Sequence, residues 1–388
     1  MTRRTVWILG AGFSMPLGGP SLASLLSFET ERSLQVEIPD DTDHAVEREN
    51  ILGRVASCTR WLYHYGTKFA ANNGRCPLNG SGGETLWYDA EDFFDKVDRA
   101  ARLPEGAKAA RLAAAIRGGA HGTNVPIPAV RDAAKRLLAY ECARFLDDES
   151  PSDEPWIPYV RWTRQVKAQA DGGAPTAQAI ITFNYDCVLE TLGFQPHVVL
   201  PGCAPARKGP HIFKLHGSSN WRHLSPGYGD SNDTTPAVTE ENDAVELTQR
   251  KDFTATCDRT ELAIAAPGPG KQYQALRFKD LWDTAADALK AAGAVVFLGY
   301  RLPPTDARSR RFFLDNLPQG RIPIHVVLGH DTNSPDARRM TGLLEMARPQ
   351  ACIEALPMFG QDYLDSWDPS RWDSFIRSRR PSSTTSNE

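Results

Sequence analysis

The stretch TVWILGAGFSMPLGGPSL, residues 5–22, decides how the rest of this 388-residue chain is interpreted. A run of five residues rich in apolar side chains leads directly into a turn that contains Gly10, Gly12, Gly18 and Gly19. Three interpretations are open: a secretory signal, a plain strand–helix turn, or a loop that approaches a phosphate with its backbone. The remainder of the sequence discriminates between them.

A secretory signal is the weakest of the three interpretations. Arg3 and Arg4 precede the apolar run, but the run is short, glycines interrupt it, and no small-x-small cleavage site follows. The seven cysteines are odd in number and form no CxxC pair, which argues against a disulfide framework and against a zinc ribbon. We therefore expect a cytoplasmic protein with reduced thiols, without zinc or any other bound metal.

The overall composition is that of a soluble globular protein, with 41% hydrophobic and 24% charged residues. The formal net charge of −4 creates no global field toward nucleic acid or an anionic membrane. No stretch approaches the roughly 18 apolar residues of a membrane span. We expect neither a membrane partner nor direct nucleic-acid binding.

Short apolar runs bounded by Gly, Pro or Asn recur along the chain and predict strands. They are 5–9, 179–183, 197–200, 211–215, 261–266, 294–299, 324–329 and, less clearly, 352–356. Their nearly continuous apolar character is typical of parallel strands that are covered on both faces. Residues 278–294 have helical spacing and predict a helix that stops near Gly293. The fold class is therefore α/β, a Rossmann-like doubly wound, mostly parallel sheet.

The predicted strands are unevenly distributed, which suggests how the chain is divided. Helical patterns fill most of the gap after the first strand, so we expect a large helical insertion over residues 31–177. The sheet domain then comprises residues 1–30 and 178–376. A Gly/Asp/Thr-rich polar loop is expected at 226–247, and a disordered tail at 377–388.

Polar residues follow four of the predicted strands at their carboxyl ends, the edge at which α/β sheets bind ligands. The four segments are GAGFS (10–14), FNYD (183–186), LHGS (215–218) and GYRLPPTD (299–306). His216 is a candidate acid or base. Asn184 can donate and accept hydrogen bonds, and Asp186 can carry charge or simply cap a helix.

The glycine loop departs from the dehydrogenase fingerprint GxGxxG. Met15 stands where the third glycine belongs, and Asp40 lies 28 residues past Gly12 rather than the usual ~20. These departures disfavour a nucleotide-dependent oxidoreductase.

The ordered set GAGFS…GGP, TFNYD, LHG and GYRLPPTD resembles the sirtuin-like superfamily, most of all the prokaryotic sirtuin-like domains of antiviral NAD-consuming systems. The resemblance covers residues 5–24 and about 178–315. It implies catalytic roles for Asn184, His216 and Asp186. It also implies an NAD-binding set, which is Gly10, Ala11, Gly12, Phe13, Ser14, Gly19, Pro20, Gly299, Tyr300 and Asp306.

The chain also departs from the deacetylase sirtuins, because it lacks their two zinc-binding CxxC pairs. The resemblance then implies an NAD hydrolase that releases nicotinamide and ADP-ribose, acting as an NAD-depleting effector of bacterial antiphage defence. It further implies a homo-oligomer or a complex with a separate ATPase or sensor. A protein deacylase or ADP-ribosyltransferase, and a non-catalytic NAD- or ADP-ribose-binding module, remain alternatives.

Overall fold

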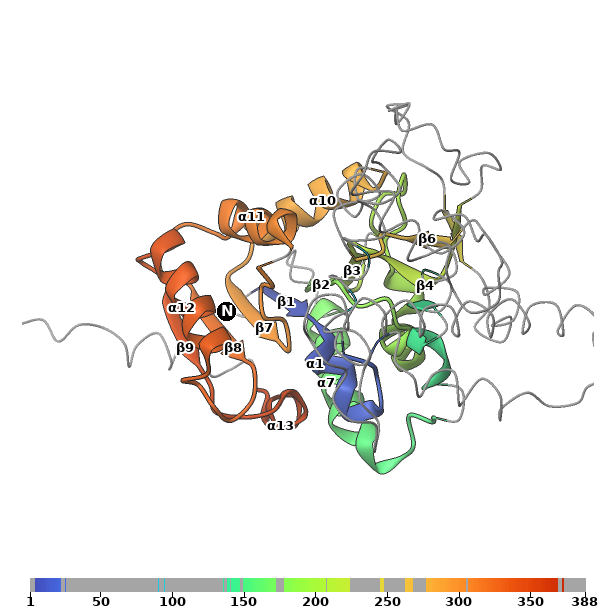
Figure 1. Ribbon diagram of the computed structural model, residues 1–388, viewed down its shortest axis with the longest axis horizontal. Helices are drawn as coiled ribbons and strands as arrows, with labels where there is room; N and C mark the ends of the chain where they lie inside the picture. Colours follow the sequence, from blue (N-terminus) through green and yellow to red (C-terminus); the bar gives the residue numbers. More distant parts are fainter. Residues whose placement is uncertain are drawn as a thin grey trace, which may run out of the picture.

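A computed structural model describes residues 4–21, 149–171, 178–206, 208–223, 245–247, 262–267, 277–304 and 306–368, with isolated positions and a short run between 25 and 146 and Trp372. Its centre is a six-stranded sheet in the order β3-β2-β1-β7-β8-β9. The strands are β1 (Thr5–Leu9), β2 (Ala179–Thr182), β3 (His211–Lys214), β7 (Ala294–Leu298), β8 (Pro323–Val327) and β9 (Cys352–Ala355). Figure 1 shows these strands side by side.

All neighbouring strands of this sheet run parallel. The order is that of a doubly wound Rossmann-like sheet, in which the chain builds outward from β1 in one direction and then in the other. The predicted fold class is therefore confirmed. The change of direction falls between β1 and β7, where such sheets form a crevice at the carboxyl edge.

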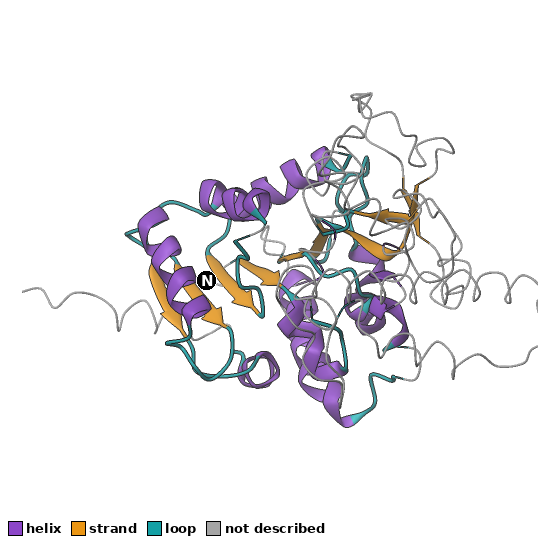
Figure 2. Ribbon diagram, in the orientation of Figure 1, coloured by secondary structure: helices purple, strands orange, loops and turns teal. Residues whose placement is uncertain are grey.

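The strands are apolar throughout because both faces of the sheet are covered. Val6 and Ile8 of β1 pack into one core with α10 (Lys279–Lys290), α11 (Ala307–Asn316) and α12 (Pro335–Ala347). Trp7 and Leu9 face the opposite core, with α7 (Ile157–Asp171) and α13 (Gly360–Ser366). Side chains alternate across a strand, so the two sets separate onto the two faces. Figure 2 shows the strands of the sheet between these helices.

Helix α10 is the helix predicted over residues 278–294, and it buries the apolar positions that the spacing indicated. Its buried residues are Leu281, Trp282, Ala285, Ala286, Ala288 and Leu289. The helix ends at Lys290, before the predicted stop. Gly293 instead starts the approach to β7, where its N–H donates to the Arg4 carbonyl at 2.8 Å.

Two predicted strands differ from the structure. Residues 197–200 form only one β-bridge, between Val198 and Ile212, because His197 still belongs to the 3-10 helix η5 (Gln195–His197) and a turn follows at residues 201–202. Residues 262–264 form β6 (Leu262–Ile264), but β6 belongs to a second, antiparallel sheet in the order β5-β4-β6.

The second sheet depends on β4 (Gly217–His223), which no apolar run predicted because its sequence begins Gly-Ser-Ser-Asn. Its partner β5 (Val245–Leu247) occupies the last three residues of the expected polar loop at 226–247. Strand β4 follows β3 after a two-residue turn, so the turn that contains His216 joins the two sheets.

The expected helical insertion at 31–177 and the expected tail at 377–388 lie mostly or entirely outside the described residues, and the domain boundaries stay predictions. The described end of the insertion is the 3-10 helix η3 (Glu154–Trp156) and α7. Helix α7 packs directly on the sheet, where the rings of Trp162 and Trp7 meet edge to face at 5.2 Å. None of the described helices is long and apolar enough to cross a membrane.

We expect Trp7→Ala to lower the free energy of unfolding by about 3–5 kcal/mol, because a fully buried indole leaves a cavity in the core. Trp7 is fully buried and meets Trp162, Trp367 and Tyr363 edge to face. Met346→Ala on α12 is the control, since Met346 is 75% exposed and its loss should change stability by less than about 0.5 kcal/mol. Urea denaturation followed by circular dichroism measures the free energy of unfolding of both variants. Equal losses of stability in Trp7→Ala and Met346→Ala would contradict the packing of Trp7 in the core.

Candidate functional site at the carboxyl edge of the sheet

The turn after β1 and the turn after β7 pack backbone against backbone. Gly10 donates its N–H to Leu298 at 3.1 Å, and Gly12 donates to the Gly299 carbonyl at 3.2 Å. A Cβ on Gly10 would lie 2.6 Å from the Gly299 oxygen, and one on Gly12 would lie 2.7 Å from the Gly299 Cα. Side chains at these positions would push the two turns apart. Packing at the crevice therefore explains Gly10 and Gly12 directly.

The other residues of the glycine loop have different surroundings. Phe13 is buried and faces the core, where its ring meets Tyr159 edge to face at 5.2 Å. Gly19 donates to the Ser14 carbonyl at 3.0 Å and closes the loop. Ala11 and Pro20 are half-buried at its surface. The short helix α1 (Ala11–Ser14) and the 3-10 helix η1 (Met15–Leu17) form the loop itself.

Asn184 follows β2 and ties its end to the glycine loop. Its Nδ2 donates to the Gly10 carbonyl at 3.0 Å and to Ser14 Oγ at 3.2 Å. A carbonyl can only accept, so these contacts fix which side of the amide is nitrogen. Its Oδ1 accepts no hydrogen bond from the described part of the chain, and the residue is half-buried. Asn184 therefore presents an anchored acceptor at the carboxyl edge.

Asp186, two residues after Asn184, is buried. Its Oδ1 accepts the Val188 N–H at 3.2 Å, and Ser14 hydrogen bonds to its carboxylate. Burial raises the pKa of the Asp186 carboxyl, and Lys214 and Ser14 only partly oppose that effect. Burial therefore disfavours the ionised form of this carboxyl group.

A buried ion pair supports this segment from below. Lys214 of β3 donates to Glu190 Oε1 at 2.8 Å and to the main-chain oxygen of Asp186 at 2.6 Å. Burial opposes the charged ammonium, but Glu190 and neighbouring anionic groups outweigh it and raise the pKa of Lys214. Lys214 thus hydrogen bonds to the backbone of the site and also lowers the pKa of the Asp186 carboxyl through its charge. Glu190 begins η4 (Glu190–Phe194).

His216 lies in the turn between β3 and β4 and is 2% exposed. Phe183 contacts it edge to face at a centroid distance of 4.6 Å, and the rings of Tyr185 and Trp282 lie at 6.3 and 6.1 Å. Its Nε2 lies 3.4 Å from Asp306 Oδ2. The imidazole therefore lies among aromatic rings and beside the Asp306 carboxylate.

Phe183, which follows β2, contacts residues at the ends of both β7 and β3. Its ring stacks on Tyr300 at 4.7 Å with an interplanar angle of 14°, while its edge meets His216. Tyr300 is buried, and the residue before it, Gly299, accepts a hydrogen bond from Gly12 in the glycine turn. The ends of β1, β2, β3 and β7 thus form one continuous set of contacts, as the sequence predicted.

The structure places Asp306 against His216 and at the start of α11. Its expected contact with NAD stays a prediction. Several supporting residues were not anticipated: Ser309, Lys214, Glu190 and Trp282. Ser309 lies three residues after Asp306, the spacing at which an N-cap side chain meets its helix. That spacing is the one local signal that could have indicated it.

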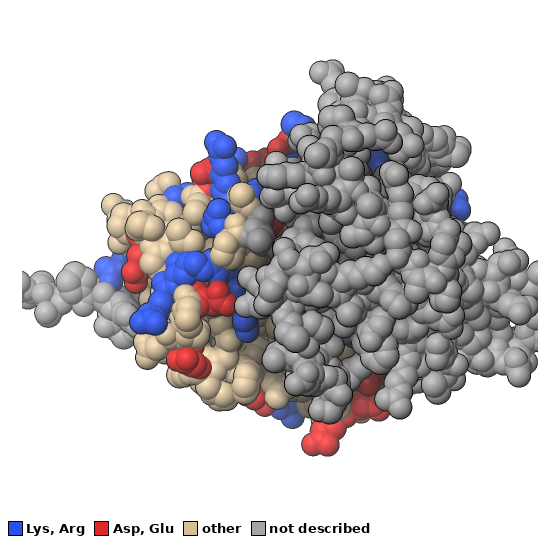
Figure 3. Space-filling view, viewed as in Figure 1, with Lys and Arg blue, Asp and Glu red and all other residues tan. Residues whose placement is uncertain are grey.

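The charged surface beside the site is mixed. Arg301 and Arg339 both pair with Asp336, and Arg311 pairs with Asp315. Figure 3 shows basic and acidic side chains interspersed on the described part of one face. Among the described residues, no group of three or more His, Cys, Asp or Glu side chains could hold a metal ion.

Neither the models of known protein families nor curated protein sequences match this chain. Solved structures of sirtuins do align with it. A structure on sirtuin substrate affinity gives a TM-score of 0.31 and 11% identity over 97% of this chain and 94% of its own. A structure of Sir2 bound to an inhibitor, 2′-O-acetyl-ADP-ribose and a deacetylated peptide gives a TM-score of 0.31 and 11% identity. That alignment covers 93% of this chain and 90% of the Sir2 chain. A structure on the mechanism and regulation of Sir2 enzymes gives a TM-score of 0.30 and 13% identity. That alignment covers 63% of this chain and 80% of the other chain. These scores are too low to carry an argument, so function is argued from the site itself.

We expect Gly299→Ala to destabilise the protein more than Gly320→Ala. Both glycines have positive φ, 65° and 92°, so both substitutions incur a left-handed backbone cost of about 1–2 kcal/mol. A Cβ at 299 would also lie 2.5 Å from Gly12, whereas one at 320 meets nothing within 4 Å. Overpacking should add about 1–3 kcal/mol at Gly299. Urea denaturation tests this, and equal losses would show that the two turns are not in close contact.

We expect the free energy of unfolding of Asp186→Asn to rise relative to that of the wild type as the pH rises from about 4 to about 7. The folded pKa of Asp186 is raised, so the folded state holds that proton more tightly than the unfolded state. Raising the pH through this window therefore removes stability from the wild type but not from the amide variant. Asn can still accept the Val188 N–H.

The control for this prediction is Asp315→Asn, because the Asp315 side chain is 61% exposed and its effect should be small at both pH values. Urea titrations at about pH 4 and about pH 7 give the free energies of unfolding of the wild type and both variants, and so test this prediction. A larger loss for Asp186→Asn at pH 7 than at pH 4 would mean that the ionised carboxylate stabilises the fold.

Proposed function

We propose that the chain is a sirtuin-like NAD hydrolase that cleaves the bond between nicotinamide and ribose to give nicotinamide and ADP-ribose. One observation carries the proposal: Ser14, Asn184, Asp186 and His216 come from three strand ends that meet at the carboxyl edge of one parallel sheet. This edge, next to the change of winding between β1 and β7, is where doubly wound sheets bind nucleotides.

The binding roles follow from what each group can do. The glycine loop places Ser14 and its own backbone beside Asn184, and these polar groups suit the phosphates and ribose of NAD. The open Oδ1 of Asn184 can accept a hydrogen bond from a ribose hydroxyl, because Gly10 and Ser14 hold its nitrogen away. Gly299 and Tyr300 would border the adenosine half, as the resemblance implies.

The reaction needs charge stabilisation and one proton acceptor. When the C1′–N bond breaks, its electron pair passes to the nicotinamide ring and neutralises the pyridinium charge, leaving an oxocarbenium-like ribose. Water then adds to C1′ and loses a proton. His216 is the candidate base, a role typically worth about 10²–10⁴-fold, and the carboxylate of Asp186 would favour the cationic sugar.

Hydrolysis is preferred over transfer to a protein because of the surroundings of His216. Phe183, Tyr185 and Trp282 enclose the imidazole, which is 2% exposed. Such an enclosure suits water as the acceptor better than a peptide side chain. The role as an NAD-depleting effector of bacterial antiphage defence, as a homo-oligomer or with an ATPase or sensor partner, rests on the sequence resemblance.

Incubation of the purified chain with NAD, followed by chromatography for nicotinamide and ADP-ribose, tests the proposal. We expect turnover by the wild type and at least about a 10²-fold loss in Asn184→Ala and His216→Ala. Matched controls are Asn316→Ala, in α11, and His211→Ala, at the opposite end of β3 from His216, which should keep nearly full activity.

Other outcomes of this assay would indicate a different function for the chain. ADP-ribosylated or deacylated protein in place of free ADP-ribose would indicate a transferase or deacylase. NAD binding without turnover would indicate a binding module. Full activity in both Asn184→Ala and His216→Ala would reject this site as the place of the chemistry.

A further inference from the structure

His216 Nε2 faces two oxygen atoms from the start of α11. Asp306 Oδ2 lies 3.4 Å from it, and Ser309 Oγ lies 3.5 Å from it. The three residues are between 0% and 5% exposed. Both distances are longer than an ideal hydrogen bond, as is common for catalytic contacts before substrate binds.

The protons of this group can be assigned from its geometry. Ser309 Oγ donates to Asp306 Oδ2 at 2.6 Å, so the serine proton points toward the carboxylate. Ser309 can then only accept from the imidazole, and an ionised Asp306 can only accept as well. Two acceptors face Nε2, which favours a proton on that nitrogen. In neutral His216 the lone pair therefore resides on Nδ1.

We infer that Asp306, assisted by Ser309, holds His216 in the Nε2–H tautomer and makes Nδ1 its proton-accepting nitrogen. Asp306 is thus a positioning residue. The consequence for catalysis rests on the proposed function, whereas the tautomer itself does not.

The two oxygens of Asp306 perform separate tasks. Oδ1 accepts the Ser309 N–H at 3.0 Å and caps α11. A structural N-cap needs nothing more. Oδ2 instead lies toward the hydroxyl and the imidazole, so the carboxylate does more than begin a helix.

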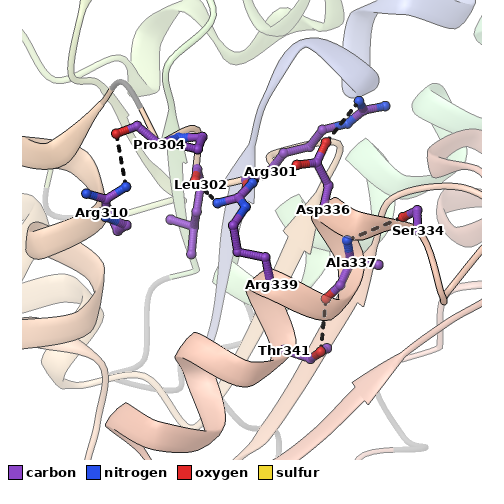
Figure 4. A network of polar contacts seen from close by, with 9 residues as sticks. All are labelled: Arg301, Leu302, Pro304, Arg310, Ser334, Asp336, Ala337, Arg339 and Thr341. Atoms are coloured by element: carbon purple, nitrogen blue, oxygen red, sulfur yellow. Dashed lines mark hydrogen bonds and ion pairs between the residues drawn. The ribbon is translucent and has the colours of Figure 1, made fainter.

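The loop that delivers Asp306 is fixed from a neighbouring helix. Arg339 of α12 donates to the carbonyls of Leu302 and Arg301 at 2.6 and 2.9 Å, and Arg310 donates to that of Pro304 at 3.0 Å. Figure 4 shows these contacts around the loop. Leu302 is fully buried with a φ of 47°, an uncommon conformation for a residue other than glycine. The loop between β7 and α11 is therefore well placed to position a side chain.

In the proposed reaction the proton from a ribose hydroxyl or the attacking water would pass to Nδ1. The imidazolium that forms would keep its Nε2–H toward Asp306, whose carboxylate stabilises the positive charge without taking the proton. The proton then returns to solvent as ADP-ribose leaves.

The experiment uses the full chain with ¹⁵N-labelled histidine rings, and His216→Gln identifies the resonances of His216. At a pH where His216 is neutral, we expect a protonated Nε2 and an unprotonated Nδ1. In Asp306→Asn the amide keeps the cap but can present its NH₂ to the imidazole. We therefore expect the opposite tautomer in that variant.

Two further variants keep the test decisive. Asp306→Ser retains a capping oxygen without the carboxylate and should give mixed tautomers. Ser334→Ala, which removes the N-cap of α12, is the matched control for loss of a helix cap and should leave the wild-type tautomer unchanged. An unprotonated Nε2 in the wild type, or an unchanged tautomer in both Asp306 variants, would overturn the inference.

Activity provides the second readout. We expect Asp306→Asn to lower kcat by at least about 10²-fold with KM nearly unchanged, since an amide beside a catalytic histidine imposes the wrong tautomer. Equal changes in kcat for Asp306→Asn and Ser334→Ala would reduce Asp306 to a helix cap and overturn the inference. If NAD were not cleaved at all, the proposed function would fail, while the nitrogen resonances would still decide the tautomer.

Discussion

The contact between the glycine turn after β1 and Gly299 after β7 organises the carboxyl edge of the sheet. It falls between the two strands from which the winding proceeds in opposite directions. Two backbone hydrogen bonds and the absence of side chains at Gly10, Gly12 and Gly299 allow this approach. The two turns therefore pack together at the carboxyl edge, and the residues that follow them are positioned relative to this contact.

The polar groups above this contact are held at a cost in stability. Asn184 uses both of its donors on the glycine loop, which leaves its carbonyl oxygen as the free acceptor among the described residues. Burial raises the pKa of Asp186, and the nearby ammonium of Lys214, which hydrogen bonds to Glu190 and to a main-chain oxygen, only partly opposes this. Buried titratable groups with shifted pKa values cluster at functional sites. This pattern agrees with a reactive site better than with a structural turn.

The sheet was predictable from the sequence because strands covered on both faces are continuously apolar, and the helix α10 because its apolar spacing is regular. The convergence of four strand ends followed from parallel topology. The sequence could not indicate β4, whose Gly-Ser-Ser-Asn start lacks an apolar run, or the separate sheet that takes β6. It also gave no sign of the packing role of the glycines, whose predicted contact with NAD stays a prediction. Their local pattern resembles a phosphate loop, whereas the requirement at Gly10 and Gly12 comes from Gly299, nearly three hundred residues away.

The pairing of His216 with Asp306 was equally beyond local patterns, because it joins the turn after β3 to the start of α11. The central claim is that these strand ends make one NAD site. A crystal structure of the His216→Ala variant soaked with NAD tests that claim most directly. The account predicts ordered NAD along the carboxyl edge, with a ribose hydroxyl within hydrogen-bond distance of Asn184 Oδ1. NAD bound elsewhere, or an edge left empty at saturating NAD, would contradict it.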